Sequence, residues 1–260
     1  MSSATITTSA RLMNSTPQTE EQAMVRKVAV SSFLGNFIEW FDYASYSYFA
    51  TTIALVFFPT DNHTVAMLQT FGVFALSFIL RPIGALFWGS YGDKKGRKAA
   101  LAHSIMFMSG ASFLIGCLPS YSVIGVGAPI LLLLLRMVQG FSASGEYAGA
   151  ATFLGEYAPT SKRGIYCSLI PAFTAIGLLA GSTLATLMTA NMNSSAMVGW
   201  GWRVPFLLAG PLGLIVLYIR AKLADSPVYQ SMNDALESKG AASADGQIAA
   251  KSGMFAPLAE

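Results

Sequence analysis

Residues 89–101 read Gly-Ser-Tyr-Gly-Asp-Lys-Lys-Gly-Arg-Lys-Ala-Ala-Leu, and they separate two apolar runs, at 65–91 and at 99–118. A helix needs about 20 mostly apolar residues to cross the hydrocarbon core of a bilayer, and both runs reach that length. The short basic segment between them has the composition of a loop at a membrane surface. This stretch therefore predicts two membrane-spanning helices joined by a tight, positively charged turn.

The rest of the chain repeats this pattern. Further apolar runs lie at 28–58, 128–157, 165–188 and 204–219, which brings the expected spans to six. The last run is short, but Arg203 and Arg220 at its ends can extend toward the membrane surfaces. Charged residues are 11% of the 260 residues and the mean hydropathy is +0.53, whereas soluble domains carry about 25% charged residues. We therefore expect an all-α polytopic membrane protein.

The basic residues indicate the orientation of the chain. Lys and Arg gather before residue 28, at 94–98, at 162–163 and after residue 219, whereas Arg203 lies alone on the other side. By the positive-inside rule, both ends of this chain are then cytoplasmic. We expect a disordered tail at 1–24, a six-helix bundle at 25–220 and a cytoplasmic linker at 221–260. The net charge of +3 is small and belongs to these loops, so we expect no nucleic-acid partner.

The loop at 89–101 closely resembles the signature of the major facilitator superfamily, Gly-x-x-x-Asp-(Arg/Lys)-x-Gly-(Arg/Lys)-(Arg/Lys)-x-x-Leu. The matching residues include Gly89, Asp93, Gly96 and Arg97. Gly96 permits a tight turn, Gly89 allows helices to approach closely, and Asp93 can pair with a basic residue. An ordinary basic loop explains the Lys and Arg residues but not the Asp and two Gly at these spacings.

Two further matches lie downstream. Leu132, Arg136, Gln139 and Gly140 resemble the superfamily pattern Leu-x-x-x-Arg-x-x-Gln-Gly, and helical periodicity places Glu146 on the same face. Charges at this depth in a membrane are costly and commonly functional, although a structural ion pair between helices is the alternative.

Glu156 and Arg163 resemble the Glu-x6-Arg pair of superfamily sugar carriers. With Asp93 and Arg97 they imply a cytoplasmic gating motif, made up of Gly89, Asp93, Gly96, Arg97, Glu156 and Arg163. A solvated loop with unpaired charges is the alternative reading.

Four stretches together resemble the metabolite:proton symporter family, whose members carry proline and betaine, 2-oxoglutarate, shikimate or citrate. They are Gly-Asn-Phe-Ile-Glu-Trp-Phe-Asp at 35–42, Arg-Pro-Ile-Gly at 81–84, and the segments 139–147 and 200–206. The resemblance implies half of a twelve-helix fold, built as two inverted three-helix repeats, in the cell inner membrane. It also implies that a second six-helix half belongs to the same full-length chain. A self-contained six-helix protein could end in a similar tail.

The first span carries a polar stripe. Asn36, Glu39, Tyr43 and Tyr46 share one face, with Asp42 beside it. At 1.5 Å per residue, Glu39 and Arg81 each lie roughly 15 Å from the cytoplasmic ends of their helices, so they can meet. We expect a substrate and proton pathway that consists of Asn36, Glu39, Asp42, Tyr43, Tyr46, Arg81, Arg136, Gln139 and Glu146. A permanent structural pair is an equally good reading of Glu39.

These features predict a proton-coupled symporter that imports a small organic metabolite. A zwitterionic osmolyte such as proline or betaine is the favoured substrate. Aromatic side chains such as Trp40 and Tyr48 suit a quaternary ammonium, although packing is the commoner use of such side chains. A carboxylate symporter and a six-helix channel or scaffold are the alternatives. An intramembrane serine protease at Ser142 lacks a histidine base in the last three spans, so no enzyme is expected. We expect no cofactor and no metal site.

Overall fold

The computed structural model describes residues 17–223 and residue 231, and every regular element among them is helical. The first half contains α2 (Pro17–Tyr48), α3 (Ala50–Phe57), α4 (His63–Ile79), α5 (Arg81–Lys95) and α6 (Arg97–Cys117). The second half contains α7 (Tyr121–Ile124), α8 (Gly127–Ala143), α9 (Glu146–Tyr157), η1 (Thr160–Lys162), α10 (Arg163–Asn191), α11 (Ser194–Ala196), the π turn η2 (Met197–Gly201) and α12 (Arg203–Ala221).

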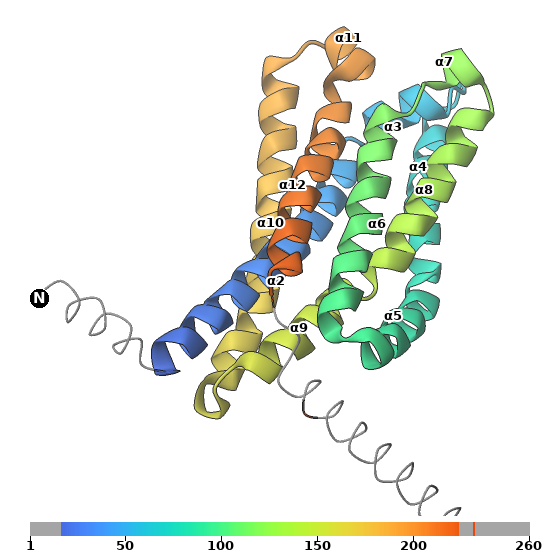
Figure 1. Ribbon diagram of the computed structural model, residues 1–260. Helices are drawn as coiled ribbons and strands as arrows, with labels where there is room; N and C mark the ends of the chain where they lie inside the picture. The colour runs from blue at the N-terminus through green and yellow to red at the C-terminus, as the bar shows by residue number, and fades with distance from the viewer. Residues whose placement is uncertain (1–16, 224–230, 232–260) are drawn as a thin grey trace, which may run out of the picture.

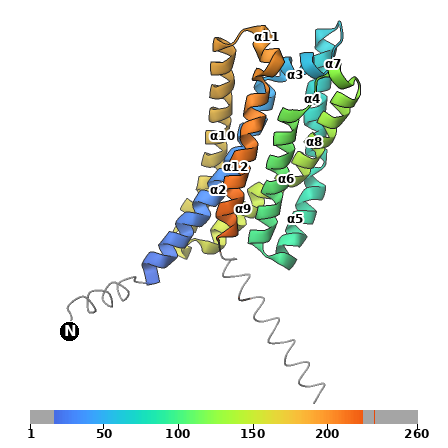
Figure 2. The same ribbon diagram turned by 45° about the horizontal axis from the view of Figure 1, so that its top comes forward.

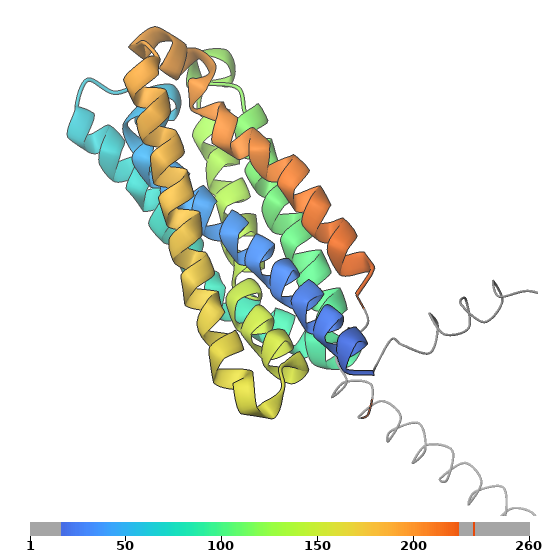
Figure 3. The ribbon, with the colours of Figure 1, turned by 90° about the vertical axis from the view of Figure 1, so that its left-hand side faces the viewer.

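The long helices pack side by side into one elongated bundle (Figure 1). The short helices α7 and α11 lie at one end of the bundle, and α5 and α9 lie toward the other. Figure 2 shows the same ends after a tilt of the view. Helix α2 lies between α10 and α12 and contacts both of them, as Figure 3 shows from the side. Because α2 also packs on α9, its polar stripe is enclosed by the bundle.

Among the described residues, five helical segments are long and apolar enough to cross a membrane. They are His63–Lys95, Arg97–Cys117, Gly127–Tyr157, Thr160–Asn191 and Ser194–Ala221. The first expected span, at 28–58, is divided between α2 and α3 by a turn at Phe49. Helix α2 begins at Pro17, earlier than the expected start of the bundle at residue 25. The expectations for 1–16, and for most of 221–260, concern residues outside the described part of the chain.

Two more of the expected single spans also consist of two helices each. The run 65–91 is interrupted at Leu80, because Pro82 has no backbone N–H to continue the hydrogen-bond ladder of α4. The run 128–157 is interrupted at Ser144 and Gly145, between α8 and α9. These interruptions place Arg81 at the first residue of α5 and Glu146 at the first residue of α9.

The bundle is apolar both inside and outside. Its interior contains three clusters of buried side chains, centred on residues such as Trp202, Phe153 and Met108. Large apolar side chains also cover its outer surface: Leu86 is 79% exposed and Leu214 is 68% exposed. A soluble monomer seldom exposes apolar surface on this scale, so this outer face fits contact with lipid.

Candidate functional site

The polar stripe of α2 is buried within the bundle. Asn36, Glu39, Asp42, Tyr43 and Tyr46 are all at most 6% exposed. A charge in such surroundings needs a partner, because its removal from water costs several kcal/mol, on the order of 3 or more. Both carboxylates of the stripe have an arginine partner, and the two arginines come from different helices.

Glu39 pairs with Arg81, as the matched depths in the sequence predict. Arg81 Nη2 donates to Glu39 Oε1 at 2.7 Å, and it also contacts the Tyr43 hydroxyl. The Arg81 side chain is 27% exposed, whereas that of Glu39 is 1% exposed. Glu39 Oε2 and Arg81 Nε are buried without a partner among the described residues. This pair is therefore reachable from one side and has unused hydrogen-bonding atoms.

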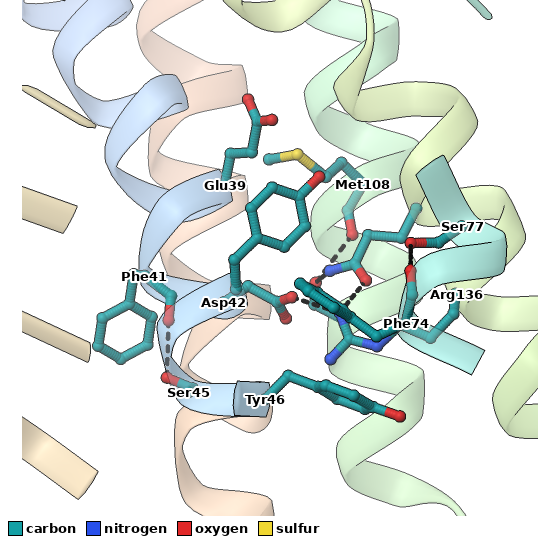
Figure 4. Close-up of polar contacts among 12 residues, drawn as sticks. Glu39, Phe41, Asp42, Ser45, Tyr46, Phe74, Ser77, Met108 and Arg136 are labelled. Carbon is teal, nitrogen blue, oxygen red and sulfur yellow. Dashed lines mark hydrogen bonds and ion pairs between the residues drawn. The ribbon is translucent and has the colours of Figure 1, made fainter. Parts of the chain in front are cut away.

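Asp42 pairs with Arg136 of α8 deeper in the bundle. Arg136 Nη1 donates to Asp42 Oδ2 at 2.6 Å, and both side chains are at most 2% exposed. The guanidinium lies 3.8 Å from the ring centroid of Tyr46, so that ring also stabilises the cation. Figure 4 shows Asp42 directed toward Arg136, with Glu39 one turn away on the same helix.

The Asp42–Arg136 pair leaves several atoms without partners. Arg136 Nη1 also donates to Gln139, whose Nε2 donates to Ser112 on α6 at 2.6 Å. However, Asp42 Oδ1 and Arg136 Nε and Nη2 are buried and have no hydrogen-bond partner among the described residues. Asp42 therefore retains an oxygen that could accept a proton.

Glycines allow the helices that carry this site to approach closely. A Cβ on Gly140 would overlap the carbonyl oxygen of Ser77, and a Cβ on Gly84 would overlap that of Phe141. These contacts fix α8 against α4 and α5, and so place Arg136 opposite α2. The sequence pattern contains Gly140 directly after Gln139, which is where this contact occurs.

Asn36 and Tyr46 are anchored on other helices. Asn36 Nδ2 donates to the Ile170 carbonyl at 2.9 Å and to Thr174 at 3.0 Å, both on α10. The Tyr46 hydroxyl donates to the Thr70 carbonyl at 3.0 Å. Thr174 was absent from the sequence-based candidates, because no local pattern distinguishes it from other threonines in an apolar helix.

Glu146 forms a third buried pair, with Arg220 of α12. Both Glu146 oxygens accept from Arg220, whose other bonds go to Ser31 and to the Leu101 carbonyl. We expected Arg220 to extend toward the membrane surface, but it is 1% exposed, so that expectation is wrong. The signal was present, since Arg220 continues the buried positions of α12 at spacings of three and four, which are Phe206, Ala209, Gly213 and Val216.

The charges of the expected gating motif are brought together in part. Arg97 pairs with Asp93 at 3.0 Å and approaches Glu156 at 3.9 Å, whereas Arg163 is exposed and has no ion pair among the described residues. Gly96 has φ 96°, which confirms the expected tight turn. A Cβ on Gly89 would meet open space, so the close approach expected there is not found among the described helices.

An open cavity of about 480 Å³ lies beside the Glu39–Arg81 pair, between α2, α4 and α10. Aromatic side chains make up half of its lining residues. Tyr43 is one of them, and its hydroxyl also contacts Arg81. Tyr46 does not line it, because that side chain is directed to Thr70 and Arg136. Within residues 17–223, no group of three or more His, Cys, Asp or Glu residues could hold a metal ion.

A family model described as "Sugar (and other) transporter" matches residues 27–252. The chain therefore belongs to this transporter family. It is 42% identical over 217 residues to the proline/betaine transporter of Salmonella typhimurium, covering 84% of this chain and 43% of that protein. The same figures apply to a glycine betaine/proline/ectoine/pipecolic acid transporter of Dickeya dadantii. The chain thus spans less than half the length of the curated relatives it matches.

Solved structures share the fold. A proton:xylose symporter of the superfamily aligns with TM-score 0.72 and 16% identity, over 80% of this chain and 46% of that chain. A xylose transporter from E. coli in a partially occluded inward-open conformation aligns with TM-score 0.71 and 19% identity, over 81% and 52% of the two chains. At this identity the likeness establishes the helical membrane-transporter fold alone.

Proposed function

We propose that this chain is part of a proton-coupled symporter that imports a small zwitterionic osmolyte, such as proline or betaine, by alternating access. The observation that carries the proposal is the presence of two buried carboxylate–arginine pairs, one turn apart on α2, that both retain unpartnered atoms. Charges inside a membrane protein commonly mark ion and substrate pathways. The names of the relatives support the substrate class.

In this proposal Asp42 carries the coupling proton. With Asp42 ionised, its attraction to Arg136 holds α2 against α8; protonation of the free Oδ1 weakens that attraction. A proton bound from one side of the membrane thus changes the interaction between two helices. Glu39 is the competing coupling residue, because its partner Arg81 is more accessible.

Arg81 binds the carboxylate of the substrate in this proposal. Its guanidinium is partly exposed, and a planar fork of donors matches a carboxylate. A substrate carboxylate would compete with Glu39 for the same cation, which links substrate binding to the charge state of the stripe.

The arrangement of the whole protein is also part of the proposal. We infer six spans at 25–220, in which the first three and last three form inverted repeats and the stripes on α2 and α8 belong to the first helix of each repeat. A second six-helix half would follow a cytoplasmic linker at 221–260 and would enclose the site. Both ends of this chain would then be cytoplasmic, and the charges around Arg97 would close the cytoplasmic side against the second half.

Uptake by the full-length protein in proteoliposomes tests this function. A proton gradient directed into the proteoliposomes should drive accumulation of labelled glycine betaine and proline. A protonophore should abolish this accumulation. Arg81→Ala should lose substrate binding, measured as the loss of exchange as well as of accumulation. Accumulation of citrate or 2-oxoglutarate instead would favour a carboxylate symporter, and the absence of any gradient-driven uptake would contradict the proposal.

A further inference from the structure

Four aromatic rings form a continuous cluster at the open cavity beside Arg81. Tyr43 lies 5.6 Å from Trp40, 5.7 Å from Phe74 and 5.7 Å from Phe78, measured between ring centroids, and Phe74 lies 5.2 Å from Phe78. All four side chains line the cavity of about 480 Å³, a volume typical of small-molecule sites. We call Trp40, Tyr43, Phe74 and Phe78 the aromatic cage.

A single arginine adjoins this cage. The Arg81 guanidinium carbon lies 4.6 Å from the Phe78 centroid and 5.1 Å from that of Tyr43. Its Nη2 is used by Glu39 and Tyr43, but its Nη1 has no hydrogen-bond partner among the described residues. The site therefore presents an available donor for an anion directly beside a ring-lined space.

The lining offers little to an ammonium that carries several N–H groups. No acidic residue lies among the described residues that line the cavity. A primary ammonium would lose its hydrogen bonds to water there and could replace them only with bonds to the neutral hydroxyls of the lining, such as Ser47 and Ser182, since no carboxylate is present. A methylated ammonium has no such hydrogen bonds to lose, and ring faces attract it within about 6 Å of their centroids.

We infer that the aromatic cage binds the methylated ammonium of a short zwitterion while Arg81 Nη1 binds its carboxylate. Phe74 and Phe78 of α4 are then specificity-determining residues, which select substrates whose amine nitrogen is methylated or part of a ring over substrates with a primary amine. This inference rests on the proposed transport function and specifies which part of the site recognises which part of the substrate. The other possible occupant of the cavity is a segment of the second half, packed against the same rings.

Competition in proteoliposomes of the full-length protein tests this. The wild type should bind glycine betaine at least about tenfold more tightly than glycine, which has the same carboxylate but a primary ammonium. Phe78→Leu should raise the KM for glycine betaine by about tenfold and leave kcat within about twofold, since a leucine fills similar space without a ring quadrupole. Phe78→Tyr should keep the wild-type KM. Phe107→Leu, a change of an exposed phenylalanine outside the cage, is the matched control.

Three outcomes would overturn the inference. One is equal affinity of the wild type for glycine and glycine betaine. Another is an unchanged KM for glycine betaine in Phe78→Leu. The third is a fall in kcat for all substrates in Phe78→Leu at constant KM, which would indicate packing against the second half. In each of these cases, pH-driven uptake by the wild type would still support the proposed transport function. If the wild type showed no such uptake, both the transport function and the inference about the aromatic cage would be contradicted.

Discussion

Arg220 uses all three of its guanidinium nitrogens in hydrogen bonds to protein groups, whereas Arg136 leaves two of its three without a partner. Both arginines are buried and both pair with a carboxylate. A fully bonded pair can take up a ligand or proton only by breaking a bond that it already makes, and its bonds to three other helices serve packing. An incompletely bonded pair can change partners. This difference separates a structural pair from a pair suited to coupling.

The structural role of Arg220 can be tested by replacing its side chain. Arg220→Ala leaves the Glu146 carboxylate buried without its cation, which costs about 3 to 5 kcal/mol. The apparent melting temperature of the purified full-length protein should therefore fall by several degrees. Arg163→Ala, at an exposed arginine with no ion pair in the described part of the chain, is the control and should change it little. Equal melting temperatures for the two variants would contradict the structural role.

Helix crossings determine which charges meet, and glycine determines the crossings. A Cβ on Gly35 of α2 would overlap both the Glu146 carboxylate and the Arg220 guanidinium, which belong to α9 and α12. The absence of a side chain at Gly35 thus allows three helices to converge on one ion pair. The helix breaks at Leu80 and at Ser144 also determine where the charges lie, because a new helix begins at Arg81 and at Glu146.

Gly35→Ala tests the convergence of these helices. The added methyl group should separate α2 from the Glu146–Arg220 pair and lower stability by about 1 to 3 kcal/mol. Gly72→Ala, in α4, is the matched control, because a Cβ there meets nothing within 4 Å. That control should stabilise the protein by about 0.5 to 1 kcal/mol, since alanine restricts the unfolded chain. Thermal melting of both variants gives the comparison, and a Gly35→Ala protein as stable as wild type would contradict it.

Part of this arrangement could be predicted from the sequence. Apolar lengths predicted a helical membrane bundle and agree with the five candidate spans among the described residues, but they did not predict the breaks at Phe49, Leu80 and Ser144. Matched depths predicted that Glu39 meets Arg81. Partners in other helices could not be predicted, because periodicity indicates which face is polar but not which helix lies opposite. The pairing of Asp42 with Arg136 and the burial of Arg220 depend on helix crossings at Gly140 and Gly35, whose contacts lie on other helices.

The orientation of the molecule can be tested with its two cysteines. Cys117 is exposed at the end of α6, and Cys167 lies near the start of α10, just after the basic residues Lys162 and Arg163. With both ends of this chain cytoplasmic, a membrane-impermeant maleimide should label Cys117 from outside intact cells and Cys167 only after permeabilisation. Serine variants of each cysteine assign the signals. Labelling of Cys167 from outside intact cells would contradict this orientation.

The most direct test of proton coupling concerns Asp42. Asp42→Asn keeps the size and the hydrogen bonding of the side chain but cannot bind and release the proton. In the full-length protein it should abolish pH-gradient-driven accumulation of glycine betaine and leave measurable exchange of substrate across the membrane. Full gradient-driven accumulation by Asp42→Asn would contradict this account. If Glu39→Gln then lost it, the proton site would be Glu39, and if both variants retained it, the site would lie at Glu146 or outside residues 17–223.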